Sequence, residues 1–286
     1  MNLVIVGDSL TQGVPGCSYV SVLKRMLPSF SITALGLGGD TLLGISQRIT
    51  AYLSEAGEGV APIPEVVVIE AGANDILMPL LERRGMGWEG LGRKLRARGS
   101  LPTSDPSEFG ALYRKTVNRI LEAGVRKVVA VTIACLGEVP SSPPNRLRDA
   151  FNAEIRKLDT GTGIAGKDHV NADINMVKTM VRLKSPETVG ARPYPPAGPP
   201  GSCVAVADAA AEFDRYLINS AGSSSPYLLD SFTALTLDGL QTSIPGIADN
   251  LSKERGLRLT VDGVHFNSRG AEIYARCIAD RVLPYP

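Results

Sequence analysis

The chain contains two histidines among its 286 residues, His169 and His265. His265 stands three residues after Asp262 in a turn that contains glycine. A carboxylate this close can accept a hydrogen bond from one imidazole nitrogen and stabilise the protonated ring, which leaves the other nitrogen free to take a proton. His169 lies in an irregular, proline-rich region and is expected at the surface. The spacing therefore predicts His265 as a general base that Asp262 orients.

Ser9 is the candidate nucleophile for that base. It follows the apolar residues 4–6 and the turn Gly7-Asp8. A continuous apolar run rich in β-branched side chains is typical of a central strand in a parallel sheet, and open α/β sheets bind their ligands just beyond the carboxyl ends of the strands. A serine at this point is either a nucleophile or the N-cap of the next helix. This stretch alone leaves both interpretations open.

Two further residues could stabilise the negative charge that develops on a carbonyl oxygen during acyl transfer. Gly39 offers a backbone N–H that no side chain obstructs, and Asn74 offers a side-chain amide in the loop after a predicted strand. Taken singly, Gly39 has an ordinary interpretation as a turn glycine and Asn74 as an Asx-turn residue. Because parallel strands end at the same edge of a sheet, we expect Ser9, Gly39 and Asn74 to converge there.

Strands and helices alternate along the chain, which favours βαβ units with right-handed crossovers and a mostly parallel sheet. Short apolar runs predict strands, and segments with helical periodicity predict helices. The predicted strands are residues 4–6, 31–35, 66–70, 127–133 and 204–208, and the predicted helices are 19–27, one from about 40, 104–124, 145–158, 209–217 and one after Asn267.

Four blocks of the sequence resemble those of the GDSL, or SGNH, hydrolase superfamily and occur in the family's order. They are Gly7-Asp8-Ser9-Leu10, Gly38-Gly39-Asp40-Thr41, Gly72-Ala73-Asn74-Asp75 and Asp262-Gly263-Val264-His265. The resemblance implies a flavodoxin-like, three-layer α/β/α fold with a central, mostly parallel five-stranded sheet. It also implies hydrolysis of carboxylic esters or thioesters. The serine is not in a Gly-x-Ser-x-Gly elbow, so the α/β-hydrolase fold is not indicated.

The same resemblance implies a role for each candidate residue. Ser9 would be the nucleophile, His265 the base and Asp262 the residue that orients it. The oxyanion hole would consist of the backbone N–H groups of Ser9 and Gly39 and the side chain of Asn74. No metal or organic cofactor is expected.

Several alternative functions are compatible with parts of this sequence. A carbohydrate O-deacetylase or an acyltransferase would use the same residues, and a binding module without catalysis would keep only the fold. Dinucleotide binding at residues 36–39 is disfavoured because Thr41 stands where a G-x-G-x-x-G pattern needs glycine. A metal site from Asp168, His169 and Asp173 lacks a second histidine and a helical ligand spacing.

Composition limits the partners. The chain has 30 basic and 29 acidic residues, so no nucleic acid or anionic membrane is expected as a partner. No apolar run approaches the ~18 residues that a membrane span needs, and residues 1–3 lead into the first strand without a secretory signal. Four scattered cysteines without a CxxC pair fit a reducing compartment. We expect a cytoplasmic enzyme that acts on a small-molecule ester, and the oligomeric state is not indicated.

A single hydrolase domain is expected over residues 1–286, with inserted segments near 84–103, 160–201 and 219–250. The first segment holds the only tryptophan, Trp88, and is either a solvated basic surface or a lid that favours an anionic or amphiphilic substrate. Its basic residues are Arg84, Arg93, Lys94, Arg96 and Arg98. Clustered prolines make the second segment irregular. Short acyl chains are favoured, because no long apolar groove is evident.

Overall fold

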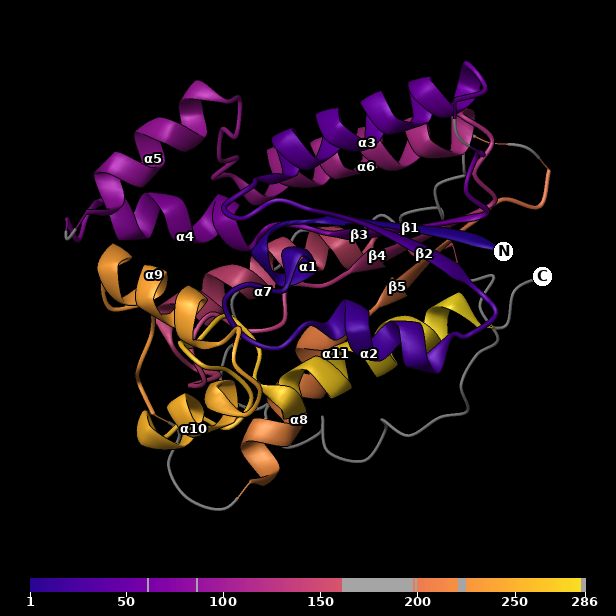
Figure 1. The fold of residues 1–286 in the computed structure, drawn as a ribbon. Coiled ribbons are helices and arrows are strands. Elements are labelled where there is room, and N and C mark those ends of the chain that lie inside the picture. Colours follow the sequence, from indigo (N-terminus) through magenta and orange to yellow (C-terminus); the bar gives the residue numbers. More distant parts are fainter. Residues whose placement is uncertain (61, 86, 161–197, 199, 221–224, 284–286) are drawn as a thin grey trace, which may run out of the picture.

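The centre of the computed structural model is a parallel sheet of five strands in the order β2-β1-β3-β4-β5 (Figure 1). The structure describes residues 1–60, 62–85, 87–160, 198, 200–220 and 225–283. The strands are β1 (Asn2–Gly7), β2 (Ser31–Gly36), β3 (Val66–Glu70), β4 (Lys127–Val131) and β5 (Cys203–Ala207). Every ladder between them is parallel. The predicted five-stranded sheet is confirmed, and the strand order is that of flavodoxin-like folds.

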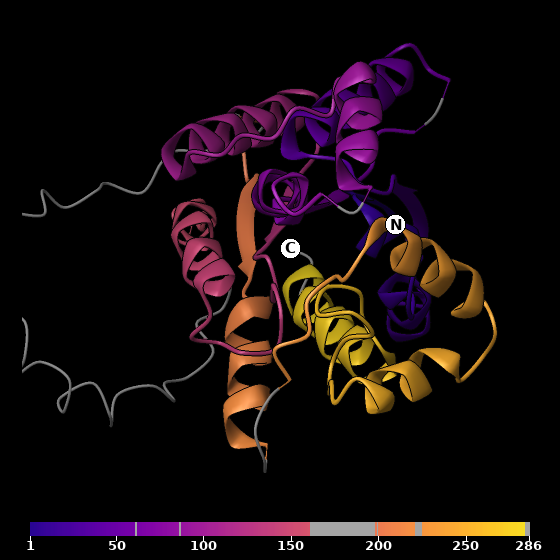
Figure 2. The same cartoon turned by 90° about the vertical axis from the view of Figure 1, so that its left-hand side faces the viewer.

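Helices cover both faces of this sheet, which confirms the predicted three layers (Figures 1 and 2). Strand side chains alternate between two apolar cores: Leu3 and Ile5 enter one, whereas Val4 and Val6 enter the other. One core is covered by α3 (Leu42–Gly57), α4 (Ala73–Glu82), α6 (Pro106–Glu122) and α7 (Pro143–Arg156), and the other by α2 (Tyr19–Met26), α8 (Ala209–Asn219) and α11 (Ser268–Val282).

The structure differs from the sequence-based expectation after β3. Asn74 was expected in a loop, but it lies in the first turn of α4. Gly72 starts this helix in a left-handed conformation, with φ of 113°, and Pro79 lies inside it. The run of small and polar residues before the helix is typical of a turn, and burial of the helix against its neighbours outweighs that local preference.

Two of the expected insertions contain helices that the periodicity did not predict. They are α5 (Trp88–Ala97) in the first segment, and α9 (Phe232–Gln241) and α10 (Ile247–Glu254) in and beyond the third. The expected insertion at 160–201 lies almost wholly outside the described residues. Within the described ranges, no helix combines the length and the apolar character that crossing a bilayer requires.

Candidate active site

Ser9, His265 and Asp262 form a chain of hydrogen bonds at the carboxyl edge of the sheet. Ser9 Oγ lies 2.9 Å from His265 Nε2, and His265 Nδ1 lies 2.7 Å from Asp262 Oδ2. Ser9 is partly exposed, whereas His265 and Asp262 are buried. The structure therefore brings together side chains that are 256 positions apart in the sequence. This is the geometry that proton transfer from a serine hydroxyl requires.

Asp262 is held by the backbone of its own turn. Its Oδ1 accepts hydrogen bonds from the N–H groups of Val264 and His265, at 3.0 and 2.8 Å. Gly263 has φ of 90°, and a Cβ there would lie 2.7 Å from the carbonyl oxygen of Tyr227, so the turn requires glycine. These backbone contacts fix the Asp262 carboxylate independently of its contact with the imidazole. The fixed carboxylate limits the His265 ring to one orientation.

The pairing shifts the pKa of both partners. Burial of the imidazole opposes its protonation, but the charge and the hydrogen bond of Asp262 outweigh this and raise the pKa of His265 above 6.5. Burial opposes ionisation of Asp262, but His265 and the backbone N–H donors outweigh it and lower the pKa of this carboxyl. Asp262 is therefore a carboxylate at neutral pH and favours the imidazolium form of His265.

A buried carboxylate from another part of the chain anchors the segment that leads into this turn. Glu138 has no exposed surface, and its Oε1 accepts the N–H groups of Leu259 and Thr260, both at 2.8 Å, and the Thr260 hydroxyl at 2.6 Å. Its Oε2 accepts the N–H of Arg258 at 2.7 Å. Glu138 thereby fixes the backbone of residues 258–260, which leads to Asp262. Nothing local in the sequence indicates this role.

Ser9 begins the short helix α1 (Ser9–Gln12) but does not cap it. The N-cap is Asp8, whose Oδ1 accepts the Leu10 N–H at 2.9 Å. The capping interpretation of Ser9 is therefore wrong, and its hydroxyl is available to His265.

Glu70 lies behind this turn. The Asp8 N–H donates to Glu70 Oε2 at 2.9 Å, and burial together with the charge of Glu70 raises the pKa of the Asp8 carboxyl. A Cβ on Gly7 would lie 2.4 Å from Glu70 Oε2, so this close approach requires glycine.

The three predicted oxyanion donors lie around Ser9, but they differ in availability. Within the described residues, the structure gives no hydrogen-bond acceptor to the backbone N–H of Ser9 or of Gly39, which has φ of 75°. Both hydrogens of the Asn74 amide are engaged, because Nδ2 donates to Asp8 Oδ2 and to the Asp40 carbonyl oxygen, each at 2.9 Å. An oxyanion would share one of these Asn74 hydrogens.

The loop that carries Gly39 is held by residues that had no predicted role. Asp40 Oδ2 accepts from Arg48 at 2.6 Å, and Asp40 Oδ1 accepts from the Ser100 hydroxyl at 2.6 Å. Asp75 accepts the N–H groups of Leu42 and Thr103, each at 2.9 Å. Asp40 and Asp75 belong to the sequence blocks named above. Their places in those blocks are the signal in the sequence that could have indicated this structural role.

A cavity of about 150 Å³ opens beside Ser9. Its polar lining consists of Asp8, Ser9, Asn74 and His265, and most of the rest is apolar. Its walls include residues from α4 and from both helical insertions, among them Leu77, Leu81, Trp88, Leu91, Phe232 and Leu235. Phe266 does not line it, because this ring packs on Phe213 and Tyr274 in the opposite core.

Three of the five basic residues in the first insertion bind other parts of the protein. Arg84 donates to the carbonyl oxygens of Leu228 and Leu229, each at 3.1 Å. Arg96 pairs with Glu82 at 2.7 Å, and Arg98 donates to the Gly38 carbonyl oxygen at 2.5 Å. These side chains are therefore structural contacts rather than a free receptor for an anionic substrate.

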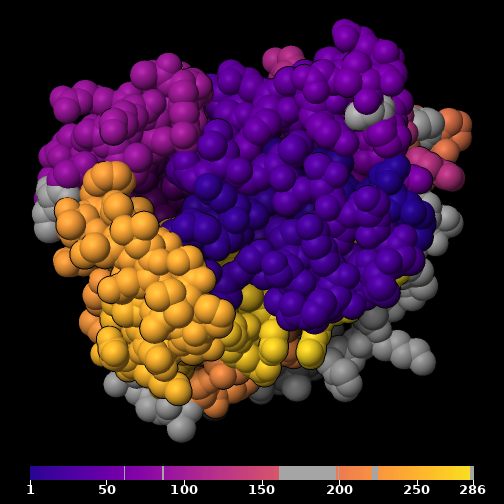
Figure 3. Space-filling view, viewed as in Figure 1, coloured from indigo at the N-terminus to yellow at the C-terminus, as the bar shows by residue number. Residues whose placement is uncertain are grey.

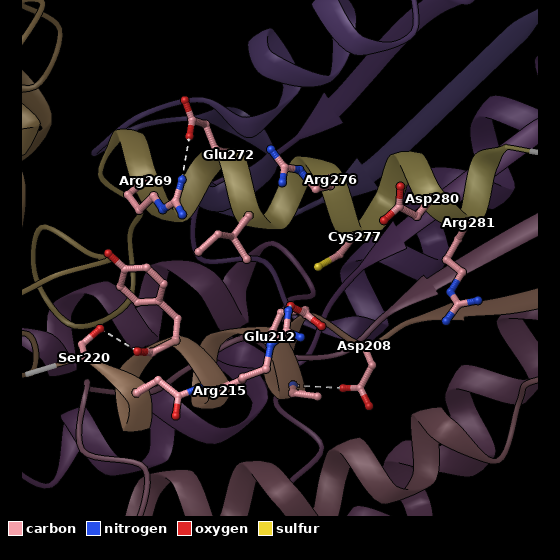
Figure 4. A pocket seen from close by; sticks show the side chains of 14 residues that line it. Asp208, Glu212, Arg215, Ser220, Arg269, Glu272, Arg276, Cys277, Asp280 and Arg281 are labelled. Atoms are coloured by element: carbon pink, nitrogen blue, oxygen red, sulfur yellow. Dashed lines mark hydrogen bonds and ion pairs between the residues drawn. The ribbon is translucent and has the colours of Figure 1, made fainter. Parts of the chain in front are cut away.

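A larger cavity, of about 960 Å³, lies between α8 and α11 (Figure 4). Its charged lining mixes both signs, with Arg269 and Glu272 paired at 3.3 Å. None of the predicted site residues lines it. Among the described residues there is also no group of three or more metal-ligating side chains, and the candidate ligands Asp168, His169 and Asp173 lie outside those residues.

Comparison with known proteins agrees with the fold and with the first three sequence blocks. The sequence profile of the GDSL-like lipase/acylhydrolase family matches residues 5–175, more than half of the chain. The chain therefore belongs to this family, as the resemblance implied, and it is an ester-hydrolysing enzyme. No match was found among curated protein sequences.

Solved structures with a similar fold share little sequence with this chain. An acetyl xylan esterase, AlAXEase, is 18% identical with a TM-score of 0.52, over 99% of this chain and 100% of its own. A catalytic mutant of Axe2, an acetylxylan esterase from Geobacillus stearothermophilus, is 15% identical with a TM-score of 0.52, over 99% and 94%. LAE5, an alpha/beta hydrolase enzyme from the metagenome of Lake Arreo, Spain, is 16% identical with a TM-score of 0.50, over 99% and 96%. At these identities the likeness concerns the fold alone.

Proposed function

We propose that the chain hydrolyses carboxylic esters through an acyl-enzyme formed on Ser9. The observation that carries this proposal is the chain of hydrogen bonds from Ser9 Oγ through His265 to Asp262, at 2.9 and 2.7 Å. A serine hydroxyl is a weak nucleophile on its own and becomes a strong one when an adjacent base takes its proton during attack. Neutral His265, with its Nδ1 proton donated to Asp262, presents an unprotonated Nε2 to Ser9.

The reaction then follows in two balanced halves. Ser9 Oγ attacks the ester carbonyl carbon while its proton passes to His265 Nε2, and the resulting tetrahedral oxyanion lies against the N–H groups of Ser9 and Gly39. Collapse of this intermediate expels the alcohol, whose oxygen takes the proton from His265. Water repeats the sequence on the acyl-enzyme, releases the carboxylic acid and restores Ser9. Asn74 contributes to the oxyanion hole through a shared hydrogen, and each such donor is worth about 10²–10³ in kcat.

Thioesters carry the same acyl group and are a second substrate class for these residues. A carbohydrate O-deacetylase or an acyltransferase would also use them, and two structures of similar fold are of acetyl xylan esterases. The apolar walls of the cavity beside Ser9 favour a more apolar acyl group than acetyl. Product analysis with and without an alcohol acceptor separates hydrolysis from transfer. A cytoplasmic location and a single domain remain predictions from the sequence.

Replacement of the nucleophile tests the proposal. We expect Ser9→Ala to abolish hydrolysis of p-nitrophenyl acetate and labelling by a fluorophosphonate, while the melting temperature stays nearly unchanged, because the side chain is partly exposed and does not cap α1. Ser21→Ala, at an exposed position of α2, is the matched control and should keep both activities. Retained turnover in Ser9→Ala would refute the acyl-enzyme.

A further inference from the structure

Both helical insertions line the cavity beside Ser9. Trp88 of α5 contacts Phe232 of α9 edge to face, with ring centroids 6.0 Å apart. The hydrogen bonds from Arg84 to the carbonyl oxygens of residues 228 and 229 join the same two segments. In the space-filling view the two insertions adjoin at one end of the molecule (Figure 3). Trp88 is only 1% exposed, so its ring forms an inner wall rather than a surface lid.

We propose that this cavity is the acyl-binding site and that it takes apolar acyl groups of about four to six carbons, or a benzoyl group, in preference to acetyl. The proposal rests on the proposed function, because the carbonyl carbon must sit at Ser9. An apolar protein cavity of about 150 Å³ holds one benzene molecule, that is, about six carbons. The volume here is about 150 Å³, and the polar lining residues gather around Ser9 and its neighbour Asp8. An acetyl group would leave most of the apolar wall without a contact.

The chain-length dependence of hydrolysis measures this preference. With p-nitrophenyl esters the leaving group stays constant, so kcat/KM should rise about fourfold per methylene from acetate to hexanoate, the factor that burial of one methylene contributes. It should fall for decanoate, because the extra carbons exceed the cavity. A series that is flat or highest at acetate would overturn the proposed acyl site while leaving the proposed ester hydrolysis intact. Failure of the folded enzyme to hydrolyse any ester would instead count against the proposed function.

Substitutions in α9 test the location of the site. Leu235→Trp fills the cavity and should lower the hexanoate-to-acetate ratio of kcat/KM at least about tenfold, the loss of two or more buried methylenes. Leu240→Trp places the same ring on the exposed side of the same helix and should keep the ratio. If Leu235→Trp does not fold, Leu91→Ala enlarges the cavity and should move the optimum to longer chains. An unchanged ratio in Leu235→Trp, or an unchanged optimum in Leu91→Ala, would overturn the proposal.

A side chain of the first insertion holds the peptide between Gly38 and Gly39. Arg98 Nη2 donates to the Gly38 carbonyl oxygen at 2.5 Å, and the Gly38 N–H donates to Gln12 Oε1 at 2.8 Å. In a trans peptide the C=O of one residue and the N–H of the next point in opposite directions. The contact with Arg98 on one side therefore directs the Gly39 N–H to the other. Both Gly38 and Gly39 line the cavity beside Ser9.

We infer that Arg98 is a positioning residue for the oxyanion hole; this inference rests on the proposed function, in which the Gly39 N–H is an oxyanion donor. Two consecutive glycines allow the peptide between them to rotate, and a rotated peptide would present a carbonyl oxygen to the oxyanion. The guanidinium binds the carbonyl and opposes that rotation. A charged donor on the C=O also polarises the N–H of the same peptide. The conformation of an oxyanion donor is thus set by a residue of the basic insertion.

The kinetic signature distinguishes positioning from general stability. Arg98→Ala should lower kcat by about tenfold or more with KM unchanged, up to the 10²–10³ that loss of a whole donor produces. Arg98→Lys, which keeps one charged donor, should be intermediate, and added guanidinium should partly restore Arg98→Ala. Inhibition by a boronic acid that forms a tetrahedral adduct with Ser9 should weaken in proportion to kcat. Arg96 lies in the same insertion but pairs with Glu82, so Arg96→Ala serves as the control. Equal kcat in Arg98→Ala and Arg96→Ala, or loss of kcat without rescue by lysine or guanidinium, would overturn the inference.

Discussion

Replacing Asp262 by asparagine tests whether the buried carboxylate sets the tautomer of His265. In the structure Oδ1 accepts two backbone N–H groups, from Val264 and His265, while Oδ2 accepts from His265 Nδ1. An asparagine must place its carbonyl oxygen toward the two N–H donors, because an amide NH₂ there would leave them without an acceptor. Its NH₂ group then faces His265 Nδ1 and donates to it. The ring proton moves to Nε2, and the nitrogen that should take the proton of Ser9 already carries one.

The expected loss is about 10⁴-fold in kcat, or about 5.5 kcal/mol in the activation free energy. It should appear without a large change in the melting temperature, because the side chain keeps its size and its two backbone contacts. Two measurements are needed: initial rates on a p-nitrophenyl ester, and NMR of the His265 ring to locate its proton. Asp230→Asn, which neutralises an exposed carboxylate in a neighbouring segment, is the control for charge alone. A loss below tenfold in Asp262→Asn, or a ring proton still on Nδ1, would refute this reasoning.

Three further predictions follow from contacts around the same site. The pKa of His265 is raised above 6.5 and the base must be unprotonated, so kcat/KM should fall as pH falls through that pKa; a profile with its midpoint below 6.5 would contradict the assignment. Asn74→Ala should lower kcat by about 10² or more, since it removes an oxyanion donor and frees Asp8 and the Asp40 carbonyl; activity within threefold of the native enzyme would exclude that role. Glu138→Gln should lower the free energy of unfolding by about 1–3 kcal/mol in urea titrations, because an amide NH₂ replaces one carboxylate oxygen and leaves a backbone N–H without its acceptor; an unchanged midpoint would contradict this role.

The parts of this protein that the sequence predicted are those whose determinants lie close together in the chain. Each strand is one apolar run, so the sheet follows from short segments, and the family resemblance implied its flavodoxin-like fold. Asp262 and His265 are three residues apart, so their contact could be expected from local geometry. The distance between Ser9 and His265 depends on the whole fold, yet with His169 expected at the surface only one pairing of serine and histidine remained.

The contacts that the sequence did not predict join segments far apart in the chain through backbone groups. Arg98 reaches the Gly38 carbonyl 60 positions away, and Glu138 binds the N–H groups of residues 258–260, about 120 positions away. A backbone acceptor or donor has no residue type, so no pattern of side chains marks it as a partner. The same limit applies to the cavity: Trp88 and Phe232 each belong to a segment that the sequence indicates as an insertion, and their contact joins these two segments in the cavity wall. Substrate selection in this enzyme is therefore expected to depend on its least regular segments, whereas the proposed chemistry depends on residues at the strand ends.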